Sequence, residues 1–512
     1  MGKQRAAQAG APGDDVGSWR KIDWNHTRRV VRRLQIRIAK AVKENRWNKV
    51  RTLQHLLTRS FHAKLLAVKR VTSNKGKKTP GVDGILWKTA KVRWRAARSL
   101  RRRGYKPQPL KRIYIPKKNG RKRPLSIPTM FDRAMQALYK LALAPVAETM
   151  ADGNSYGFRE GRSCADAMAA AFNALSKPNS APWVLEADIT GCYDNICHDW
   201  LLANIPMDRE VLRRWLEAGY MEGGILYPSH KGTPQGGIAS PTLANMTLDG
   251  LERVIRNAVP RRRRVNFIRY ADDFIVTGKS RRILEETIRP VVEGFLAERG
   301  LSLSPEKTAI THITDGFTFL GQTYRKTGNV LHITPAKEGV LALKRKVGTL
   351  IRKHVSAPMP ILVKKLNETL RGWGNYHRHV VAWETFVCVD KYVKEQLWRM
   401  VRRRHPRKSG TWLHRHYWQV PGHDGAFTTT AKTAKGKPRR YQVVRLQFLG
   451  IRRHIKIKAD ANPYLREYGR YFARRRNDRE SRYLLGLSAR EHLALVAKKG
   501  GNRAGASNKG VL

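Results

Sequence analysis

Residues 265–277, VNFIRYADDFIVT, consist of two apolar arms joined by two adjacent carboxylates. Val265, Phe267 and Ile268 lead into Tyr270-Ala271-Asp272-Asp273, and Phe274-Ile275-Val276 follows, so β-branched and aromatic residues favour a hairpin with its charge at the turn. Because neighbouring carboxylates repel, a fold keeps them together mainly where a divalent cation or a cationic ligand neutralises them. The stretch predicts a metal site. For the tetrapeptide alone, an Asp-Asp turn exposed to water is the commoner outcome.

A third acid follows a second apolar segment, WVLEADITGCYDNI, at residues 183–196. Its short strand delivers Asp188 to the strand end, where a lone Asp is more often a cap or turn residue than a ligand. Phosphoryl transfer with two metal ions needs carboxylates from separated parts of the chain, because the ions sit roughly 3.5–4 Å apart and must be bridged. If the two strands are neighbours, Asp188, Asp272 and Asp273 meet, and we expect them to hold two Mg²⁺ ions.

The charge of the chain indicates a polyanionic partner. Its 512 residues suggest three or four domains, and 102 Lys and Arg against 39 Asp and Glu give a formal net charge of +63. Basic clusters such as 101–103, 261–264 and 402–404 are interleaved with tryptophan and tyrosine, which suits phosphate pairing and base stacking. Apolar runs fall short of the roughly 20 residues of a membrane helix, so we expect nucleic acid and no membrane. Four cysteines without a complete zinc set suit a reducing compartment.

Helical periodicity recurs along the chain. Residues 25–44 and 47–68 each have one apolar and one very basic face, which fits either an ordinary packed helix pair or direct RNA contact. Residues 130–150 also predict a helix, and 281–299 predict one kinked at Pro290. Beyond residue 335, apolar residues at helical spacing predict a small helical module.

Turn-rich segments separate these helices. Residues 101–128 predict strands around a Lys-Asn-Gly turn flanked by Lys117 and Arg123, and such cations can swing over a triphosphate, although exposed turn lysines usually do nothing specific. NSYGFREGRS at 154–163 is a loop rich in Gly and Arg. In the Pro/Gly turn that begins at 231, Gly236 and Gly237 let the backbone approach a substrate closely.

The order of these segments, from about residue 20 to 490, resembles the group II intron-encoded reverse transcriptases, also called maturases. The resemblance rests on a series of motifs in combination: TPGVDG, YIPKKNGRKRPLSIP, DRAMQAL, SYGFREGRS, ADITGCYDNI, GTPQGGIASPTLAN, RYADD, LSLSPEKT, FLG and RGWGNYH.

The resemblance implies an α+β chain: a right-hand polymerase with fingers and palm, a helical thumb known as domain X, and a basic C-terminal DNA-binding extension. It implies the following boundaries: a disordered lead at 1–18, an N-terminal extension and fingers at 19–175, the palm at 176–334, the thumb at 335–425, the DNA-binding domain at 426–490 and a disordered tail at 491–512.

The same resemblance assigns roles at the acids. Asp188 and Asp272 would be the metal-ligating acids of the palm, and Asp273 would be the second acid of the Tyr-Ala-Asp-Asp motif. Tyr193 falls where the family has an aromatic residue that blocks a 2′-hydroxyl and so selects deoxynucleotides. The family more usually has Phe there, so the phenolic oxygen is a mild departure.

Further roles concern the nucleotide and the RNA. Lys117 and Arg123 match the fingers cations that grip the triphosphate, Gln235 matches a glutamine beside the incoming nucleotide, and Lys307 matches a lysine near the pyrophosphate. Ser126 stands where the family usually has Gly, which puts little in doubt. The most recognisable stretch of the thumb is RGWGNYHRH at 371–379, and the resemblance implies RNA contacts by Arg371, Trp373 and Tyr376.

We therefore expect an RNA-directed DNA polymerase that copies intron RNA into cDNA and a maturase that assists splicing and retrohoming. Its partners would be group II intron RNA, an RNA template with a DNA primer, dNTPs and target DNA, in the bacterial cytoplasm. Many members continue into a His-Asn-His endonuclease with paired cysteines, whereas this sequence has no cysteine after Cys388. We thus expect no second-strand nicking and a cDNA primer from elsewhere, such as a nascent strand at a replication fork. The alternatives are a retron or diversity-generating reverse transcriptase, or a splicing-only maturase.

Overall fold

The computed structural model describes residues 19–116, 120, 122–260, 264–419, 425–432 and 436–484, with side chains up to residue 476. The chain divides into two compact units. The first comprises residues up to 167, 183–310 and 457–472, and the second comprises 168–182, 311–456 and the residues after 472.

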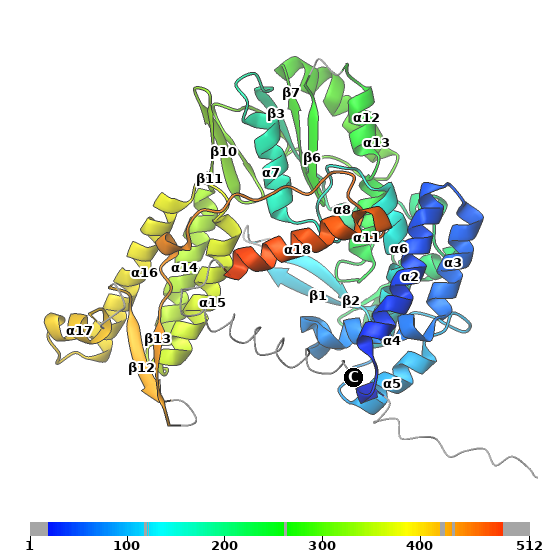
Figure 1. Cartoon of the computed structure of the whole chain (residues 1–512). Helices are drawn as coiled ribbons and strands as arrows, with labels where there is room; N and C mark the ends of the chain where they lie inside the picture. Colours follow the sequence, from blue (N-terminus) through cyan, green and yellow to red (C-terminus); the bar gives the residue numbers. More distant parts are fainter. Residues whose placement is uncertain are drawn as a thin grey trace, which may run out of the picture. The chain divides into compact units, whose positions relative to one another are not determined.

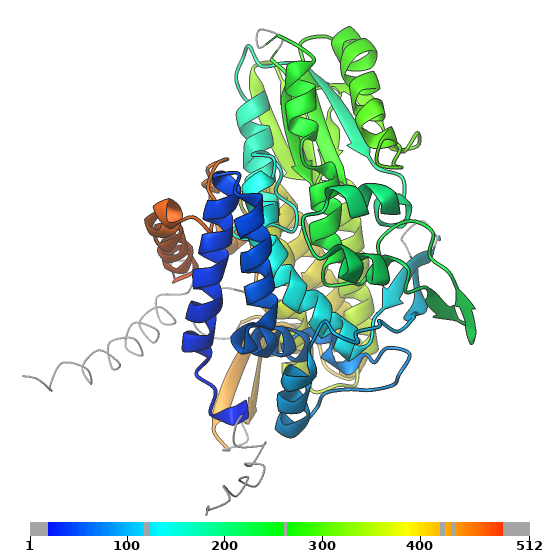
Figure 2. The ribbon, with the colours of Figure 1, turned by 90° about the vertical axis from the view of Figure 1, so that its right-hand side faces the viewer.

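Four helices build the N-terminal part of the first unit. They are α2 (Trp24–Lys43), α3 (Trp47–Arg59), α4 (Phe61–Ser73) and the long α6 (Met130–Met150). The first three helices pack against α6 and bury their apolar faces in the core of the unit (Figures 1 and 2). The predicted segment 47–68 is therefore two helices. Ser60 lies between them with extended ψ of 126°, which stops the first helix and starts the second. The short α5 (Ala90–Ser99) packs against α4.

A small sheet follows, in the order β2-β1-β4-β5. The predicted hairpin is confirmed, because β1 (Leu110–Pro116) and β2 (Lys122–Ile127) pair in antiparallel fashion. The strand β4 (Tyr220–Glu222) adds to β1 in parallel, and β5 (Ile225–Tyr227) closes the sheet.

A second sheet of the first unit contains the quoted hairpin. Strands β6 (Asn266–Tyr270) and β7 (Asp273–Gly278) pair in antiparallel fashion, and β3 (Trp183–Asp188) lies on the other side of β7, with the start of β8 (Ala309–His312) beyond it. Strands β6 and β7 are almost wholly buried. Short helices connect the strands of this unit: α8 (Cys192–Asn195), α9 (His198–Asn204), α10 (Arg209–Leu216), α11 (Ser240–Leu248), α12 (Leu251–Asn257) and α13 (Arg289–Ala297).

The predicted kinked helix at 281–299 takes a specific form. A π-helical turn, Ile283–Ile288, precedes α13, and Pro290 lies in the first turn of that helix. Proline has no N–H for the regular i→i−4 ladder, so the hydrogen-bond pattern changes register just before it.

The second unit joins a three-stranded sheet to a helical module. The sheet has the order β11-β10-β9, from β9 (Phe317–Phe319), β10 (Gln322–Thr327) and β11 (Val330–Pro335). The helices are α14 (Lys337–Lys353), α15 (Met359–His377), α16 (Trp383–Arg404) and α17 (Gly410–Tyr417). Most of the apolar residues at helical spacing are buried, although Ile361 is exposed. A hairpin of β12 (Thr428–Lys432) and β13 (Pro438–Gln442) follows, and then a 3₁₀ turn, Leu446–Leu449.

Residues 457–472 return to the first unit. The amide of Ile457 donates to the buried Asp166 carboxylate at 2.8 Å, and the guanidinium of Arg162 donates to the Ala459 carbonyl at 2.7 Å. Arg32 stacks on the Tyr464 ring, 4.4 Å from its centroid. The boundary between the units thus falls inside the segment 426–490, and the predicted domain limits stay predictions. The helix α18 (Gly469–Leu484) follows, and across the described ranges no helix is both long and apolar enough to cross a membrane.

Candidate active site

Three acids from two distant segments meet at one end of the β6-β7-β3 sheet. Strand β6 ends opposite the start of β7, with Tyr270 facing Asp273, so that Ala271 and Asp272 form the turn. In the antiparallel pairing of β3 with β7, Asp188 lies directly opposite Asp273. Directly opposed residues in an antiparallel pair have Cβ atoms roughly 4.5–5.5 Å apart. The neighbouring strands required by the sequence argument are therefore present.

Burial and neighbouring negative charge make the Asp272 and Asp273 carboxylates reluctant to ionise. Burial, together with the charges of Asp188 and Asp272, raises the pKa of Asp273 to about 7. Burial also raises the pKa of Asp272, with Asp188 adding to the effect, while Lys307 and Arg123 oppose it. The end of the sheet thus concentrates negative charge that a cation would relieve.

Lys307 already supplies one positive charge. Its ammonium pairs with the Asp188 carboxylate. The preceding residues lie alongside the end of β3, since the amide of Thr190 donates to the Ser302 carbonyl at 2.9 Å and that of Ser304 to the Asp188 carbonyl at 2.8 Å. The main chain itself therefore brings Lys307 to the acids.

The acids suit magnesium by their chemistry, although they do not form a closed cage. Within the described residues, no cluster of three or more His, Cys, Asp or Glu is arranged to hold a metal ion by itself. Mg²⁺ usually takes one or two carboxylates and completes its octahedron with waters and substrate phosphates. Oxygen donors at a site of excess negative charge fit such an ion.

A hollow of ≈ 510 Å³ lies between β1, β4 and the Pro/Gly turn that begins at 231, and two of the predicted nucleotide-binding residues, Tyr193 and Gln235, line it. The Gln235 side chain donates to the Asp194 carboxylate at 2.9 Å. The backbone carbonyl of Gln235 accepts from the backbone amide of Ser126 at 2.8 Å. Burial raises the pKa of Tyr193, with Asp272 as the next cause, so the phenol stands close to the acids. At Gly236, φ is +120° and a Cβ would stand 2.9 Å from the Ser126 carbonyl oxygen, which explains the glycine.

Of the two predicted fingers cations, Arg123 lies on β2 opposite Ile115, with its side chain exposed. Its positive charge opposes the rise in the pKa of Asp272 and of Tyr193 that burial causes. Lys117 lies outside the described residues.

In the second unit, the three predicted RNA-binding residues of α15 differ in environment. Arg371 is exposed. Trp373 packs against Phe386, with ring centroids 5.9 Å apart, so much of its surface serves the helical module. The Tyr376 hydroxyl donates to the Leu320 carbonyl at 2.8 Å. Arg371 is thus the residue of the three best placed for a phosphate, and all three assignments remain predictions.

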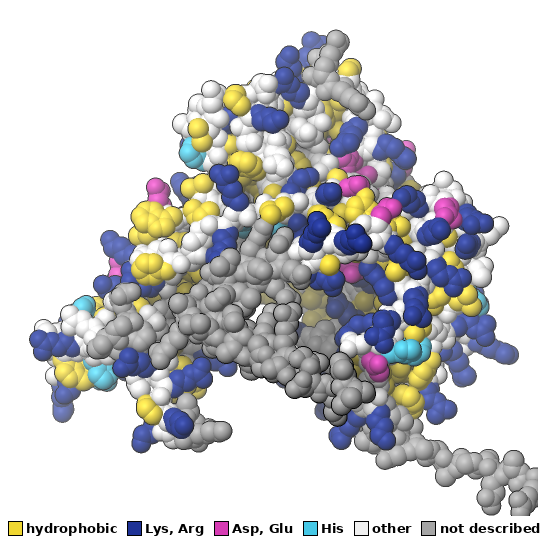
Figure 3. Space-filling view, in the orientation of Figure 1, with side chains coloured by type: hydrophobic (Ala, Val, Ile, Leu, Met, Phe, Trp, Pro, Cys, Tyr) yellow, Lys and Arg dark blue, Asp and Glu magenta, His cyan; other side chains and the backbone are white. Residues whose placement is uncertain are grey.

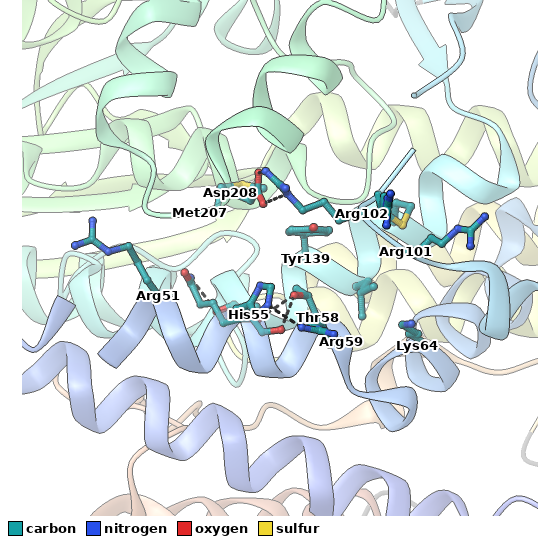
Figure 4. A pocket seen from close by; sticks show the side chains of 15 residues that line it. Arg51, His55, Thr58, Arg59, Lys64, Arg101, Arg102, Tyr139, Met207 and Asp208 are labelled. Atoms are coloured by element: carbon teal, nitrogen blue, oxygen red, sulfur yellow. Dashed lines mark hydrogen bonds and ion pairs between the residues drawn. The ribbon is translucent and has the colours of Figure 1, made fainter. Parts of the chain in front are cut away.

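A second, larger hollow of ≈ 810 Å³ lies between α3, α4 and α6 in the first unit (Figure 4). Six cations line it: Arg51, Arg59, Lys64, Arg101, Arg102 and Arg103. The acid at its rim, Asp208, pairs with Arg102. Figure 3 shows Lys and Arg side chains spread over the face that contains these N-terminal helices. The basic faces recognised in the sequence therefore border a concave surface.

Sequence reasoning missed the buried Arg269 and its two hydrogen-bond partners, Asn245 and Asp249. The available signal was an arginine inside an otherwise apolar strand, at a position where a charge requires a partner. The partner, Asp249, is 20 residues away in sequence and could not be chosen by spacing alone.

Three stretches of the chain match models of known protein families. Residues 115–324 match the reverse transcriptase (RNA-dependent DNA polymerase) model, 19–100 match the N-terminal domain of reverse transcriptase, and 340–418 match the group II intron, maturase-specific domain. The chain belongs to the group II intron-encoded reverse transcriptases. The right-hand polymerase fold and the enzyme class, an RNA-directed DNA polymerase, are thereby confirmed.

Relatives of this reverse transcriptase include Protein YkfC of Escherichia coli, 32% identical over 295 residues, which cover 49% of this chain and 77% of YkfC. The group II intron-encoded protein LtrA of Lactococcus lactis is 30% identical over 331 residues, 51% of this chain and 54% of LtrA. An uncharacterized 91 kDa protein in the cob intron of Schizosaccharomyces pombe is 29% identical over 381 residues, 62% of this chain and 46% of that protein. The chain thus spans about half the length of the latter two relatives.

Proposed function

We propose that this reverse transcriptase extends a DNA primer on an RNA template by nucleotidyl transfer at Asp188, Asp272 and Asp273, with two Mg²⁺ ions as cofactor. The observation that carries the proposal is the register of β3 with β7, which sets Asp188 opposite Asp273 and beside the Asp272 turn. When bound, the ions would activate the primer 3′-hydroxyl and offset the charge of the leaving pyrophosphate.

The surrounding side chains have complementary tasks. Lys307 would exchange its pairing with Asp188 for the nucleotide phosphates, which would release a carboxylate as the triphosphate arrives. Arg123, together with Lys117, would neutralise the triphosphate from the fingers. Tyr193 would pack beneath the deoxyribose and leave no room for a 2′-hydroxyl, and Gln235 would line the same hollow. This division makes catalysis a matter of position and charge.

The RNA partner would be the group II intron that encodes the protein, and the outcome would be assisted splicing, followed by cDNA synthesis at a DNA target. The maturase-specific match at 340–418 supports intron RNA as partner. The six cations of the hollow beside α3 suit the phosphodiester backbone of a folded RNA.

The test is primer extension with an RNA template, an annealed DNA primer, dNTPs and Mg²⁺, with Asp272→Asn beside the wild type. Asparagine keeps the shape of the side chain and removes the charge that would hold the metal. We expect the extension rate to fall at least about 100-fold, since metal-ion stabilisation of the transition state amounts to several kcal/mol. Equal rates for the two proteins would refute the assigned acids. Tight intron RNA binding without extension by either protein would instead indicate a splicing-only maturase.

A further inference from the structure

The turn that carries Asp272 has an unfavourable backbone conformation. Ala271 has φ of +60°, in the left-handed region that residues with a Cβ rarely adopt. Such a conformation persists only when the surrounding structure holds it. Asp272 follows immediately, so the groups that hold Ala271 also determine where that carboxylate points.

One of these groups is the guanidinium of Arg269, whose side chain is completely buried, with an exposed fraction of 0%. Its Nη1 donates to the Ala271 carbonyl and to the Asn245 amide oxygen, each at 3.3 Å. Its Nη2 donates to the Asp249 carboxylate at 2.5 Å. The rigid fork of the guanidinium thus ties the catalytic turn to two residues near the C-terminal end of α11.

The second group is the loop NSYG at 154–157, which lies along β6. The amide of Arg269 donates to the Asn154 carbonyl at 3.0 Å, and the amide of Tyr156 donates back to the Arg269 carbonyl at 2.9 Å. The loop is itself anchored, because the Glu252 carboxylate accepts from the Asn154 amide nitrogen and side chain at 2.9 and 2.7 Å. These bonds fix the loop against the strand that ends at the turn.

Gly157 brings the loop into direct contact with the turn. A Cβ at this position would stand 2.4 Å from the Ala271 nitrogen and 3.0 Å from the Tyr270 carbonyl carbon. Both are backbone atoms, so they cannot yield as the end of a flexible side chain can. Asn245 completes the connection, because its side-chain nitrogen donates to the Gly157 carbonyl at 2.7 Å while its oxygen accepts from Arg269.

We propose that Arg269 and the loop Asn154–Gly157 form a positioning device that sets the Asp272 carboxylate for metal binding. The inference rests on the proposed role of Asp272 as a metal-binding acid. It gives a specific task to the Gly- and Arg-rich loop of the sequence. Arg269 is a positioning residue, since it acts through the Ala271 carbonyl and not on the substrate.

Two variants test this from different sides. Gly157→Ala pushes on the Ala271 nitrogen from the loop. Arg269→Lys keeps one positive charge for Asp249, but a single ammonium cannot also span Asn245 and the Ala271 carbonyl. The matched control is Gly294→Ala in α13, where a Cβ meets nothing within 4 Å. The wild type and Asp272→Asn serve as references.

Each protein is measured for kcat and KM for dNTP, primer–template affinity, thermal unfolding, and Mn²⁺ affinity by electron paramagnetic resonance with a dideoxy-terminated primer and no turnover. We expect Gly157→Ala to lower kcat about 10- to 100-fold, the loss that a displacement near 1 Å produces. Mn²⁺ affinity should fall with it, while primer–template affinity stays within about twofold. Arg269→Lys should show the same signature, and Gly294→Ala should match the wild type.

Wild-type kcat and Mn²⁺ affinity in Gly157→Ala would overturn the inference. A Gly157→Ala protein that loses primer–template affinity and thermal stability together with Mn²⁺ affinity would also overturn it, because that pattern means general damage to the fold. If the wild type itself makes no cDNA, the proposed polymerase activity fails. The positioning device is then still tested by Mn²⁺ affinity: a lower affinity in Gly157→Ala than in Gly294→Ala supports it, and equal affinities overturn it.

Discussion

At the scale of the residue, Tyr193 is the side chain whose proposed role in the choice of nucleotide can be tested most directly. It follows the end of β3 by five residues, lines the hollow of ≈ 510 Å³, and has its pKa raised by burial and by Asp272. The amide of Thr233 donates to its backbone carbonyl, so its position is held by main-chain contacts.

We predict that Tyr193→Phe keeps the preference for dNTPs over rNTPs and that Tyr193→Ala weakens it at least about tenfold, since a steric block of this kind is worth about 1–3 kcal/mol. The measurement is the ratio of kcat/KM for a dNTP and its rNTP during primer extension. Phe serves as the control for loss of the hydroxyl. A strong effect of Phe together with a weak effect of Ala would mean that the phenolic oxygen, and not the ring, makes the distinction.

At the scale of the element, α15 carries the motif RGWGNYH for a packing reason. A Cβ on Gly374 would stand 2.4 Å from Cδ1 of Leu449 and 2.8 Å from Cδ2 of Leu446, whereas a Cβ on Gly372 would meet nothing within 4 Å. The 3₁₀ turn Leu446–Leu449 lies against α15 and α16. Its amides at Leu446 and Gln447 donate to the Asp390 carboxylate, each at 2.9 Å. The glycine at 374 thus admits a segment from more than 70 residues later.

We predict that Gly374→Ala lowers the free energy of unfolding by about 1–3 kcal/mol through overpacking. Gly372→Ala, two residues away on the same helix, should raise it by about 0.4–1 kcal/mol, because alanine reduces the entropy of the unfolded chain without a clash. Denaturant unfolding of the two variants gives both values. Equal effects would show that the 446–449 segment does not press on α15 in solution.

At the scale of the whole molecule, a formal charge of +63 makes association with RNA strongly dependent on salt. The cations differ, however, in how many acidic side chains lie near them. Arg281, Arg282 and Arg289 each pair with a glutamate four residues later. Around the hollow beside α3, six cations share a single acid among the described lining residues, Asp208, which pairs with Arg102 (Figure 4).

We therefore predict that the combined change of Arg51, Arg59 and Arg101 to alanine weakens RNA binding and reduces the slope of log K against log salt by roughly 2, about 0.7 for each lost phosphate contact. The matched control changes Arg281, Arg282 and Arg289 to alanine, which removes the same net charge from already paired positions. Titrations of a fluorescent RNA at several salt concentrations measure both. Identical slopes for the two triple variants would show that only net charge matters.

The sequence alone determined those features that neighbouring residues encode. The hairpin around Asp272, the strand before Asp188, the β1–β2 hairpin and the long helices are visible because strand propensity and helical periodicity are local. The three acids, and the family, followed from residue types in a specific order. Helix breaks such as Ser60 were missed, because an apolar face continues across them.

Only the tertiary structure decided which distant residues meet. The opposition of Asp188 and Asp273 depends on strand order, the pairing of Arg269 with Asp249 on burial, and the fit of Gly157 against Ala271 on the close approach of a loop to a turn. The return of residues 457–472 to the first unit was likewise visible only in the tertiary structure. Contacts between residues far apart in the chain leave no periodic signal, because their energy depends on packing and desolvation that exist only once the chain has folded.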